Sequence, residues 1–360
     1  YNSIVSGLEL DMSLEDEFER IRLNFINRAG RDYAASRGEY LNGQIVAKLL
    51  GFTFIDAADV IFFDESGKYD GRRTIPVLRE RLSYTEYAVI PGFYGSMPND
   101  TIRTFSRGGS DITGSIVAAA ADADLYENWT DVSGFLFADP HVVDNPQVMK
   151  TVTYRELREL SYMGATVIHE DAIFPVMQKK IPIRIKNTNA PDDTGTLILA
   201  DTDEPAANTV TGIAGRKGFS SINIEKYRIH DECGAVRRML EVLEEHGVNF
   251  EHIPSGIDNF SIVVETTSLA DETDDIVYDI KKVTSASSVT VENGIALIAV
   301  VGRSMKSTRG VAGTIFSSLA KENINIKMID QGSSEINIVI AVPERDYERT
   351  INTIYAAFVK

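Results

Sequence analysis

Apolar residues recur at helical spacing near the start of the chain and then gather in short runs. Residues 14–26 follow a roughly helical period with Ser13 as the expected N-cap, and a second helix is expected over about 40–50. Three short apolar runs follow, which we expect to be strands: 52–55, 60–63 and 87–91. A helical pattern at 75–82 separates the last two. Such alternation of strands and helices predicts a parallel sheet.

The alternation continues to about residue 185. Four further elements are expected, alternately helix and strand: 112–121, 125–130, 154–163 and 181–185. The next stretch, 187–207, is rich in Asn, Asp, Thr and Pro, a composition typical of a boundary between domains. We therefore expect a linker near 200–208, after an α/β domain that occupies 1–203.

Beyond the linker the chain repeats itself. Residues 222–264 match the chain 76 positions further on without a gap, which aligns Gly234 with Gly310 and Asn249 with Asn325. Each copy predicts a strand, a loop ending in Gly, an amphipathic helix, two strands joined by a turn, and a further helix. This is the βαββα order of a ferredoxin-like module.

The two copies differ at their ends. Copy one is followed by an extra strand at 288–292, whereas copy two ends with its helix at 344–358 and lacks its last strand. The run 209–214 is expected to supply that strand, which makes copy one an insertion within copy two. The expected modules are therefore 216–292 for copy one, and 209–215 with 293–360 for copy two.

Composition narrows the possible partners. Asp and Glu number 53 against 36 Lys and Arg, a formal charge of -17 that repels nucleic acids and anionic lipid surfaces. No apolar run approaches the ~20 residues of a membrane span, and one cysteine, Cys233, cannot make an intrachain disulfide. We therefore expect a cytoplasmic protein with no nucleic-acid or membrane partner. Four histidines show no paired metal-ligand spacing, so no metal site is predicted: His169, His230, His246 and His252.

The segment Ser106-Arg-Gly-Gly-Ser-Asp111 is the strongest chemical signal, because it opens the alanine-rich helix. Two glycines let backbone N–H groups approach an anion, and the helix N-terminus adds positive partial charge. Arg107 offers a planar fork for a carboxylate or phosphate, and Asp111 offers an acceptor for an ammonium or a hydrated metal. The alternative is a Gly-rich turn in which Ser110 or Asp111 merely caps the helix.

Together with other motifs, this segment resembles the aspartate kinases of the amino-acid-kinase family. The motifs that carry the resemblance are Arg107-Gly-Gly-Ser-Asp111, Trp129-Thr-Asp-Val-Ser-Gly134, Ala138-Asp-Pro140, Glu159-Leu-Ser-Tyr-Met-Gly-Ala165 and Ser36-Arg-Gly-Glu39. The two copies of the repeat resemble that family's regulatory ACT domains, most clearly at Gln331-Gly-Ser-Ser-Glu-Ile-Asn337. The resemblance implies a three-layer αβα amino-acid-kinase fold with a mainly parallel sheet, followed by two ferredoxin-like ACT modules.

The resemblance also implies an activity and its residues. The reaction is phosphorylation of the L-aspartate side chain by ATP with Mg²⁺ to give 4-phospho-L-aspartate, the committing step toward lysine, threonine and methionine. The implied aspartate site consists of Glu39, Phe93, Arg107, Ser110 and Asp111. The implied ATP site consists of Thr130, Asp131, Gly134, Leu136, His141 and Thr166. The implied effector site in copy one consists of Ile229, Glu232, Ala235, Val236, Asn249, Phe250 and Glu251.

The internal repeat bears on which amino acid is the effector. At the 76-residue offset Glu251 becomes Lys327 and Glu232 becomes Thr308, so copy one offers carboxylates where copy two offers a cation and a hydroxyl. A side-chain ammonium should prefer the carboxylates, which favours L-lysine over the alternative, L-threonine. Because open sheet edges in such modules pair across subunits, we also expect a homodimer or a higher homo-oligomer.

Several departures from the family pattern matter. The family opens with a strand ending in Lys-Phe-Gly-Gly, which this sequence lacks, so we expect that an N-terminal piece has been omitted. The alternatives are a non-catalytic amino-acid sensor of the same fold, or a kinase acting on glutamate or acetylglutamate. Thr166 and His141 stand where the family often has Lys and Arg, which reduces positive charge near the expected phosphates. Trp129 ends an apolar strand and is expected to pack in the core rather than to stack on a ligand.

Overall fold

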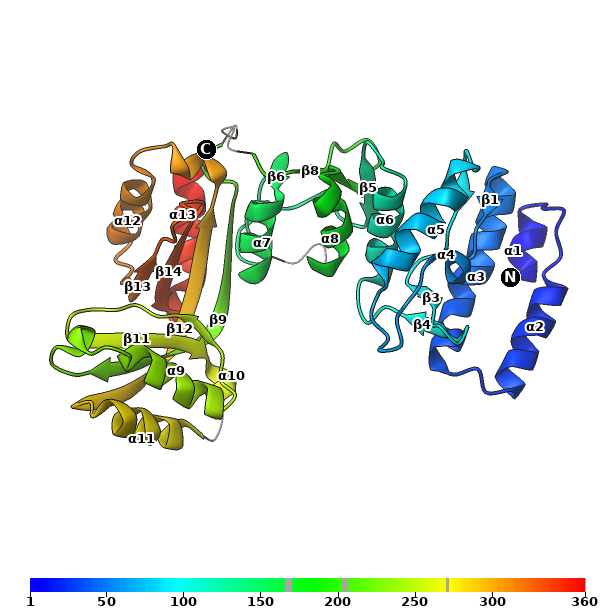
Figure 1. Cartoon of the computed structure of the whole chain (residues 1–360). Helices are drawn as coiled ribbons and strands as arrows, with labels where there is room; N and C mark the ends of the chain where they lie inside the picture. Colours follow the sequence, from blue (N-terminus) through cyan, green and yellow to red (C-terminus); the bar gives the residue numbers. More distant parts are fainter. Residues whose placement is uncertain (166–169, 203–205, 207, 270–271, 360) are drawn as a thin grey trace. The chain divides into compact units, whose positions relative to one another are not determined.

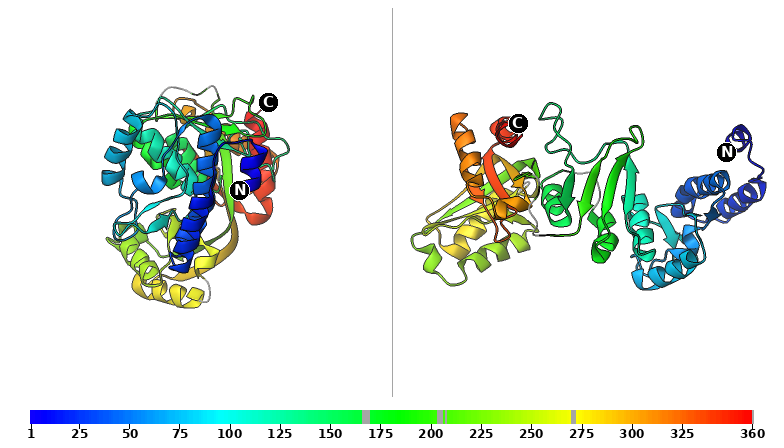
Figure 2. Two further views of the ribbon diagram at one scale, coloured as in Figure 1. Left: turned by 90° about the vertical axis from the view of Figure 1, so that its right-hand side faces the viewer. Right: turned by 90° about the horizontal axis from the view of Figure 1, so that it is seen from above.

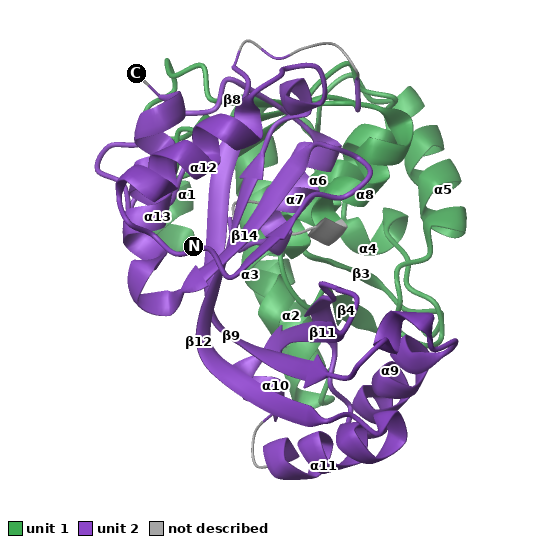
Figure 3. Ribbon diagram, turned by 90° about the vertical axis from the view of Figure 1, so that its left-hand side faces the viewer, with its two compact units in different colours: residues 1–134, 166–200 green, residues 135–165, 201–360 purple. Residues whose placement is uncertain are grey.

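Two compact units make up the structure, a computed structural model that describes residues 1–165, 170–202, 206, 208–269 and 272–359 (Figure 3). Unit 1 comprises Tyr1–Gly134 and Thr166–Ala200, and unit 2 comprises Phe135–Ala165 and Asp201–Lys360. No described helix combines the length and the apolar character that crossing a membrane requires.

Unit 1 alternates helices with short strands (Figure 1). Its elements in chain order are α1 Asn2–Gly7, α2 Glu15–Ile26, α3 Arg31–Leu50, β1 Thr53–Phe54, α4 Ala57–Val60, α5 Gly71–Ser83, β2 Ala88–Val89, β3 Tyr94–Ser96, β4 Ile102–Thr104, α6 Gly109–Ala120, β5 Tyr126–Thr130, α8 Glu170–Lys179, β7 Ile183–Asn187 and β8 Thr196–Leu199. The predicted helices and most of the predicted strands therefore form, with shifted ends.

The predicted parallel pairing is confirmed in unit 1. Strand β1 pairs with β2 in parallel, and β5 pairs with β7 in parallel from Tyr126 opposite Ile183 to Thr130 opposite Asn187. Strand β8 adds to β7 in the antiparallel sense. A groove of about 570 Å³ is lined by residues of β2, α6 and β5, among them the small residues Gly114 and Ala118.

Three local predictions for unit 1 were wrong. Helix α3 starts at Arg31 rather than near 40, because polar residues on its exposed side hide the helical period. Of the expected strand 60–63, Val60 ends helix α4, and Phe62 and Phe63 make only isolated bridges. Ser13 does not cap α2, whose N-cap is Leu14, although the Ser13 hydroxyl accepts a 3.3 Å hydrogen bond from the N–H of Glu15.

Unit 2 contains a helix that follows a short strand, and then the two repeated copies. Its elements are β6 Thr151–Thr153, α7 Tyr154–Tyr162, β9 Gly212–Glu225, η1 Ile229–Asp231, α9 Ala235–Glu245, β10 Phe250–His252, β11 Asn259–Glu265, α10 Thr266–Leu269, α11 Thr273–Thr284, β12 Ser288–Val301, η3 Arg303–Lys306, α12 Val311–Lys321, β13 Met328–Asp330, β14 Asn337–Pro343, η4 Glu344–Asp346 and α13 Tyr347–Phe358.

One antiparallel sheet of order β10-β11-β9-β12-β14-β13 joins the two copies. Strands β9 and β12 are long and run through both copies, with register shifts between Glu292 and Leu297 (Figures 1 and 2). Residues 212–216 of β9 pair with 297–301 of β12, the place where the sequence leads us to expect the run 209–214. The strand expected at 288–292 is the first part of β12 and not a separate element.

Each copy buries its own core. The core of copy one includes Ile222 from the sheet, Met239 from α9 and Ile276 from α11. In copy two, Ile298 and Ile315 pack with α13, and Phe137 from the segment before β6 joins the same core. Helices α9 and α11 lie side by side at one end of the sheet, and α12 and α13 at the other (Figures 1 and 3).

Candidate active site and effector site

The glycines at the start of α6 allow an unusually close contact. A Cβ on Gly109 would lie 2.6 Å from Cβ of Phe93, so only glycine lets the helix approach this residue. Phe93 itself has a φ of 62°, a conformation that costs a non-glycine residue free energy. Its N–H donates to Oγ1 of Thr113 at 3.0 Å, and its carbonyl accepts from the N–H of Phe105 at 2.9 Å. Gly109 and Thr113 of α6, with Phe105 before the helix, therefore fix Phe93.

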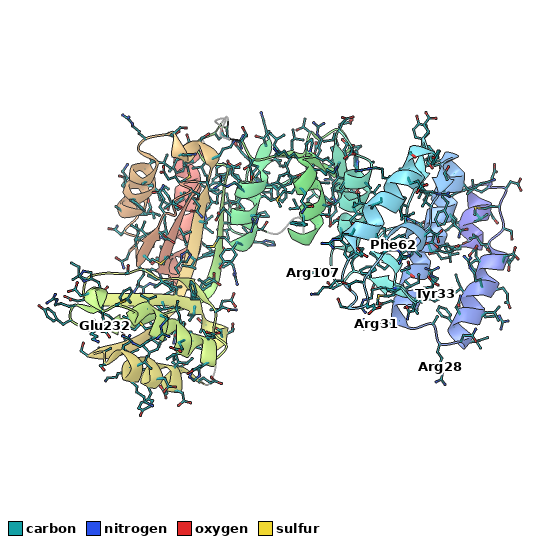
Figure 4. All side chains as sticks on the ribbon, viewed as in Figure 1. Arg28, Arg31, Tyr33, Phe62, Arg107 and Glu232 are labelled. Carbon is teal, nitrogen blue, oxygen red and sulfur yellow. The ribbon has the colours of Figure 1, made fainter. Side chains whose placement is uncertain are left out.

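Neither Ser110 nor Asp111 caps helix α6. The N-cap of α6 is Gly108, with a φ of 58° and no side-chain cap hydrogen bond, so the alternative in which Ser110 or Asp111 caps the helix is wrong. Asp111 Oδ1 instead accepts a 2.9 Å hydrogen bond from Asn128 of β5. Arg107 (Figure 4) and Ser110 are both exposed. The first N–H groups of α6 and the Arg107 fork can thus meet an anion.

Glu39 lies on the face of α3 that is turned toward this region. Asp32, seven residues earlier, accepts a 3.3 Å hydrogen bond from the N–H of Thr104, and Gly43, four residues later, approaches the Cβ of Pro91. Residues spaced by four and seven share one face of a helix. The half-buried Glu39 is therefore on the same side as the segment that carries Phe93.

Three of the predicted ATP-site residues lie at the carboxyl end of β5 or in the loop after it: Thr130, Asp131 and Gly134. Thr130 ends the strand, its carbonyl accepts from the N–H of Thr188 at 2.8 Å, and its hydroxyl donates to Asp131 at 3.2 Å. Gly134 has a φ of 112° and is too close to Thr196 to carry a side chain. The carboxyl ends of parallel strands are where ligands bind in open α/β sheets.

Two other predicted ATP-site residues are not in unit 1. Leu136 and His141 belong to unit 2, where Leu136 bridges to Val148. His141 is exposed, and its N–H and ring Nδ1 lie 2.8 and 2.9 Å from Asp139 Oδ1. Thr166 lies outside the described residues. The predicted ATP set is thus divided between the two units.

The expectation that Trp129 packs in the core is wrong. Trp129 is 45% exposed. Strand β5 turns Tyr126 and Asn128 toward α6, where both contact Asp111, so the alternate residue Trp129 lies on the opposite face. The strand period could have shown this, and it could also have pointed to Asn128, which the sequence analysis missed.

The predicted effector residues lie on two elements of copy one. Ile229 in η1 and Ala235 at the start of α9 are buried, and Val236 follows them. The Glu232 carboxylate accepts hydrogen bonds from Lys226 and Arg238. The hydrogen bond from Lys226, together with the charges of both cations, lowers the pKa of Glu232. Its charge is thus already balanced within the module.

Asn249, Phe250 and Glu251 belong to the edge strand β10 or adjoin it. Phe250 is 48% exposed, and the Glu251 carboxylate accepts a hydrogen bond from the hydroxyl of Tyr162 on α7. Burial and the contact with Glu251 raise the pKa of Tyr162 to about 12. Nothing in the sequence near either residue indicates this long-range pair.

Comparison with known families and relatives agrees with this architecture. Residues 2–187 match the amino acid kinase family, and residues 298–358 match an ACT domain. The chain is 41% identical over 271 residues to aspartokinase 3 of Bacillus subtilis, a match that covers 75% of this chain and 60% of that protein. It is 27% identical over 366 residues to the aspartokinase of Candida albicans, covering 95% of this chain and 66% of that one. The chain therefore spans about two thirds or less of these relatives.

Solved structures show the same fold. The crystal structure of Clostridium acetobutylicum aspartate kinase, described as an allosteric enzyme, matches with a TM-score of 0.89 at 52% identity, covering 99% of this chain and 82% of that one. Escherichia coli aspartokinase III with aspartate and ADP matches with a TM-score of 0.69 at 24% identity, covering 98% and 84%. With more than half of its length matched by the family model, the chain belongs to the amino acid kinase family and is related to aspartate kinases.

Proposed function

We propose that this protein is an aspartate kinase, which transfers the γ-phosphoryl group of ATP to the side-chain carboxylate of L-aspartate and yields 4-phospho-L-aspartate. The observation that supports this most is the start of α6, where the exposed Arg107 precedes the helix, Asp111 is hydrogen-bonded to Asn128, and Thr113 holds Phe93. The 52% identity to the Clostridium enzyme across 99% of the chain supports the same activity. The reaction would be the first step toward lysine, threonine and methionine.

Each residue of the proposed aspartate site has a chemical role. Arg107 would bind the α-carboxylate through two parallel N–H donors, and Asp111 and Glu39 would bind the ammonium group. Phe93 would pack against the substrate, and Ser110 would donate a hydroxyl hydrogen bond. The attacking group is the substrate's own carboxylate, so the enzyme needs to supply positioning and charge neutralisation and no nucleophile of its own.

A magnesium ion would accompany ATP in this reaction and neutralise charge on its phosphates. Magnesium in such sites is held mainly by phosphate oxygens and water, with one or two carboxylates. The described residues include no group of three or more His, Cys, Asp or Glu side chains placed to hold a metal, but they offer single carboxylates at Asp111 and Asp131. This donor set fits an ion that arrives with the nucleotide.

The test is Arg107→Lys in the protein at its natural length, with Arg28→Lys as a control. Both arginines are exposed in unit 1 (Figure 4). Lysine keeps the charge but loses the fork, so Arg107→Lys should raise the KM for aspartate at least tenfold and leave the melting temperature unchanged. An unchanged KM would reject the site. Binding of aspartate and ATP without turnover would favour the alternative, an amino-acid sensor.

We also propose that L-lysine regulates the enzyme through copy one. Glu251 provides the carboxylate for the ammonium of lysine, because the charge of Glu232 is already balanced by two cations. The corresponding residue of copy two, Lys327, pairs with Glu292 and would repel lysine. Glu251→Lys should abolish lysine binding in calorimetry, while the exposed control Glu244→Lys should keep it. Equal lysine affinity in both would reject the site, and threonine binding alone would reject the effector.

The remaining proposals concern organisation. We propose an amino-acid-kinase domain over 1–203, copy one over 216–292, and copy two over 209–215 with 293–360. We also propose a cytoplasmic homodimer or larger homo-oligomer, since β10 and β13 end the sheet of unit 2 and offer unpaired edges among the described residues. Light scattering after size-exclusion chromatography tests this, and a monomer at micromolar concentration would contradict it.

A further inference from the structure

Trp129 is an exposed aromatic residue at the carboxyl end of a parallel strand pair. It stands opposite Lys186 in the register of β5 with β7, and it directly precedes Thr130 of the proposed ATP site. The ammonium nitrogen of Lys186 lies 5.3 Å from the centroid of its ring, a distance at which a cation and an aromatic face attract. An indole that is 45% exposed in this place needs a different explanation from core packing.

Hydrogen bonds hold the surroundings of this ring in place. The ammonium of Lys186 donates to the carbonyl oxygens of Pro191 and Asp193, each at 2.6 Å. The Asp193 carboxylate accepts from the hydroxyl of Ser133 at 2.5 Å, and this hydroxyl also accepts from Asn187 at 2.9 Å. The loop after β5 and the loop after β7 are therefore tied together. The cation beside Trp129 is fixed, so the pair is a preorganised surface and not two mobile side chains.

We propose that the Trp129 indole, backed by Lys186, is the surface on which the purine base of the nucleotide stacks. This inference rests on the proposed function, because the nucleotide is placed here through Thr130, Asp131 and Gly134. A flat aromatic ring binds every base through its π face, so the contact contributes to affinity without choosing between adenine and guanine. In this arrangement the phosphate groups do not contact the ring, so the ring does not contribute to their binding free energy.

A direct test uses the fluorescence of these 360 residues, in which Trp129 is the only tryptophan. Titration with ADP should change the emission of the indole in a saturable way, and GDP should do the same. Inorganic tripolyphosphate, which has no base, should leave the emission unchanged. A saturable response to tripolyphosphate equal to that for ADP would overturn the proposal, because the signal would then not report the base.

Calorimetry on variants provides the second test. Trp129→Leu should weaken ATP binding about 5- to 150-fold, the range that follows from losing one stacking aromatic, and Trp129→Phe should recover most of this loss. Tripolyphosphate affinity should not change in either variant. The control is Tyr84→Leu, which removes a highly exposed aromatic at the end of α5 and should bind ATP like the wild type.

The outcomes separate this inference from the proposed function. Wild-type affinity for ATP in a folded Trp129→Leu protein would overturn the stacking surface and leave the kinase proposal standing. Equal weakening of ATP and tripolyphosphate would also overturn it, because the loss would then be structural. Absence of any nucleotide binding to the wild-type protein at its natural length would overturn both.

Discussion

A buried carboxylate joins α7 to the second copy of the repeat, and its neutralisation should destabilise unit 2. Glu156 is fully buried and accepts five hydrogen bonds of 2.7–2.8 Å, from the N–H and hydroxyl of Thr153, the hydroxyl of Thr211, and the N–H and guanidinium of Arg303. Burial by itself raises the pKa of Glu156, but the hydrogen bonds from Thr211, Arg303 and Thr153 outweigh it and lower the pKa below its ordinary value.

The expected size of the effect follows from these contacts. Glu156→Gln keeps the shape but removes the charge that pairs with Arg303, whose side chain is 11% exposed. The amide NH₂ that Glu156→Gln introduces is itself a donor, so it cannot accept the hydrogen bonds that the neighbouring groups donate to the Glu156 carboxylate. Breaking a buried ion pair on one side costs about 3–5 kcal/mol. At about 2–4 °C per kcal/mol for a unit of this size, the melting temperature of unit 2 should fall by about 6–12 °C or more.

Calorimetric melting of wild type, Glu156→Gln and the control Glu244→Gln measures this effect. Because the folded-state pKa is lowered, the contribution of Glu156 is present above the ordinary glutamate pKa of about 4.3 and is lost as the pH falls. The difference between wild type and Glu156→Gln should therefore shrink in acid. Pairing Glu156→Leu with Arg303→Met should recover much of the stability that Glu156→Leu loses alone. A fall no larger than that of Glu244→Gln would refute the reasoning.

Two further predictions concern copy one. The His246 ring donates hydrogen bonds to the carboxylates of Glu272 and Asp279, and these bonds raise the pKa of His246. The contribution of His246 to stability is therefore present below about pH 6.5 and is lost as the pH rises through the raised value. His246→Gln should remove this loss, and equal slopes of stability against pH in the two proteins would argue against it. We also expect that the Tyr162 hydroxyl competes with lysine for the carboxylate of Glu251. Tyr162→Phe removes this hydroxyl and should tighten lysine binding about fivefold in calorimetry. Unchanged or weaker lysine binding would count against this competition.

Hydrophobic periodicity and the internal repeat predicted the strand pairing of unit 1 and the module order of unit 2. Apolar runs that alternate with helical periods predicted the parallel pairing of β5 with β7, because neighbouring parallel strands need a crossover connection and a helix is its usual form. The 76-residue repeat led to two modules of the same order, and 212–214 of the run 209–214 pair in the sheet as expected. The module boundaries themselves stay a prediction.

Contacts between distant residues could not be predicted from the sequence. Glu156 and Arg303 are 147 positions apart, and Tyr162 and Glu251 are 89 positions apart, so no local period connects them. The exposure of Trp129 was missed for a different reason, since apolar character was given more weight than the alternation of faces along β5. The motif at Arg107 and Asp111 was recognisable because glycines and a helix start create its geometry within a few residues.

The most direct test of the account is the reaction itself. The protein at its natural length should form ADP from ATP only when L-aspartate is present, and hydroxylamine should trap the acyl phosphate as aspartyl hydroxamate. Arg107→Lys should lower this hydroxamate formation at least tenfold at low aspartate concentration, with the Arg28→Lys control like the wild type. No hydroxamate from L-aspartate, or faster formation from L-glutamate, would contradict the proposal that this protein is an aspartate kinase.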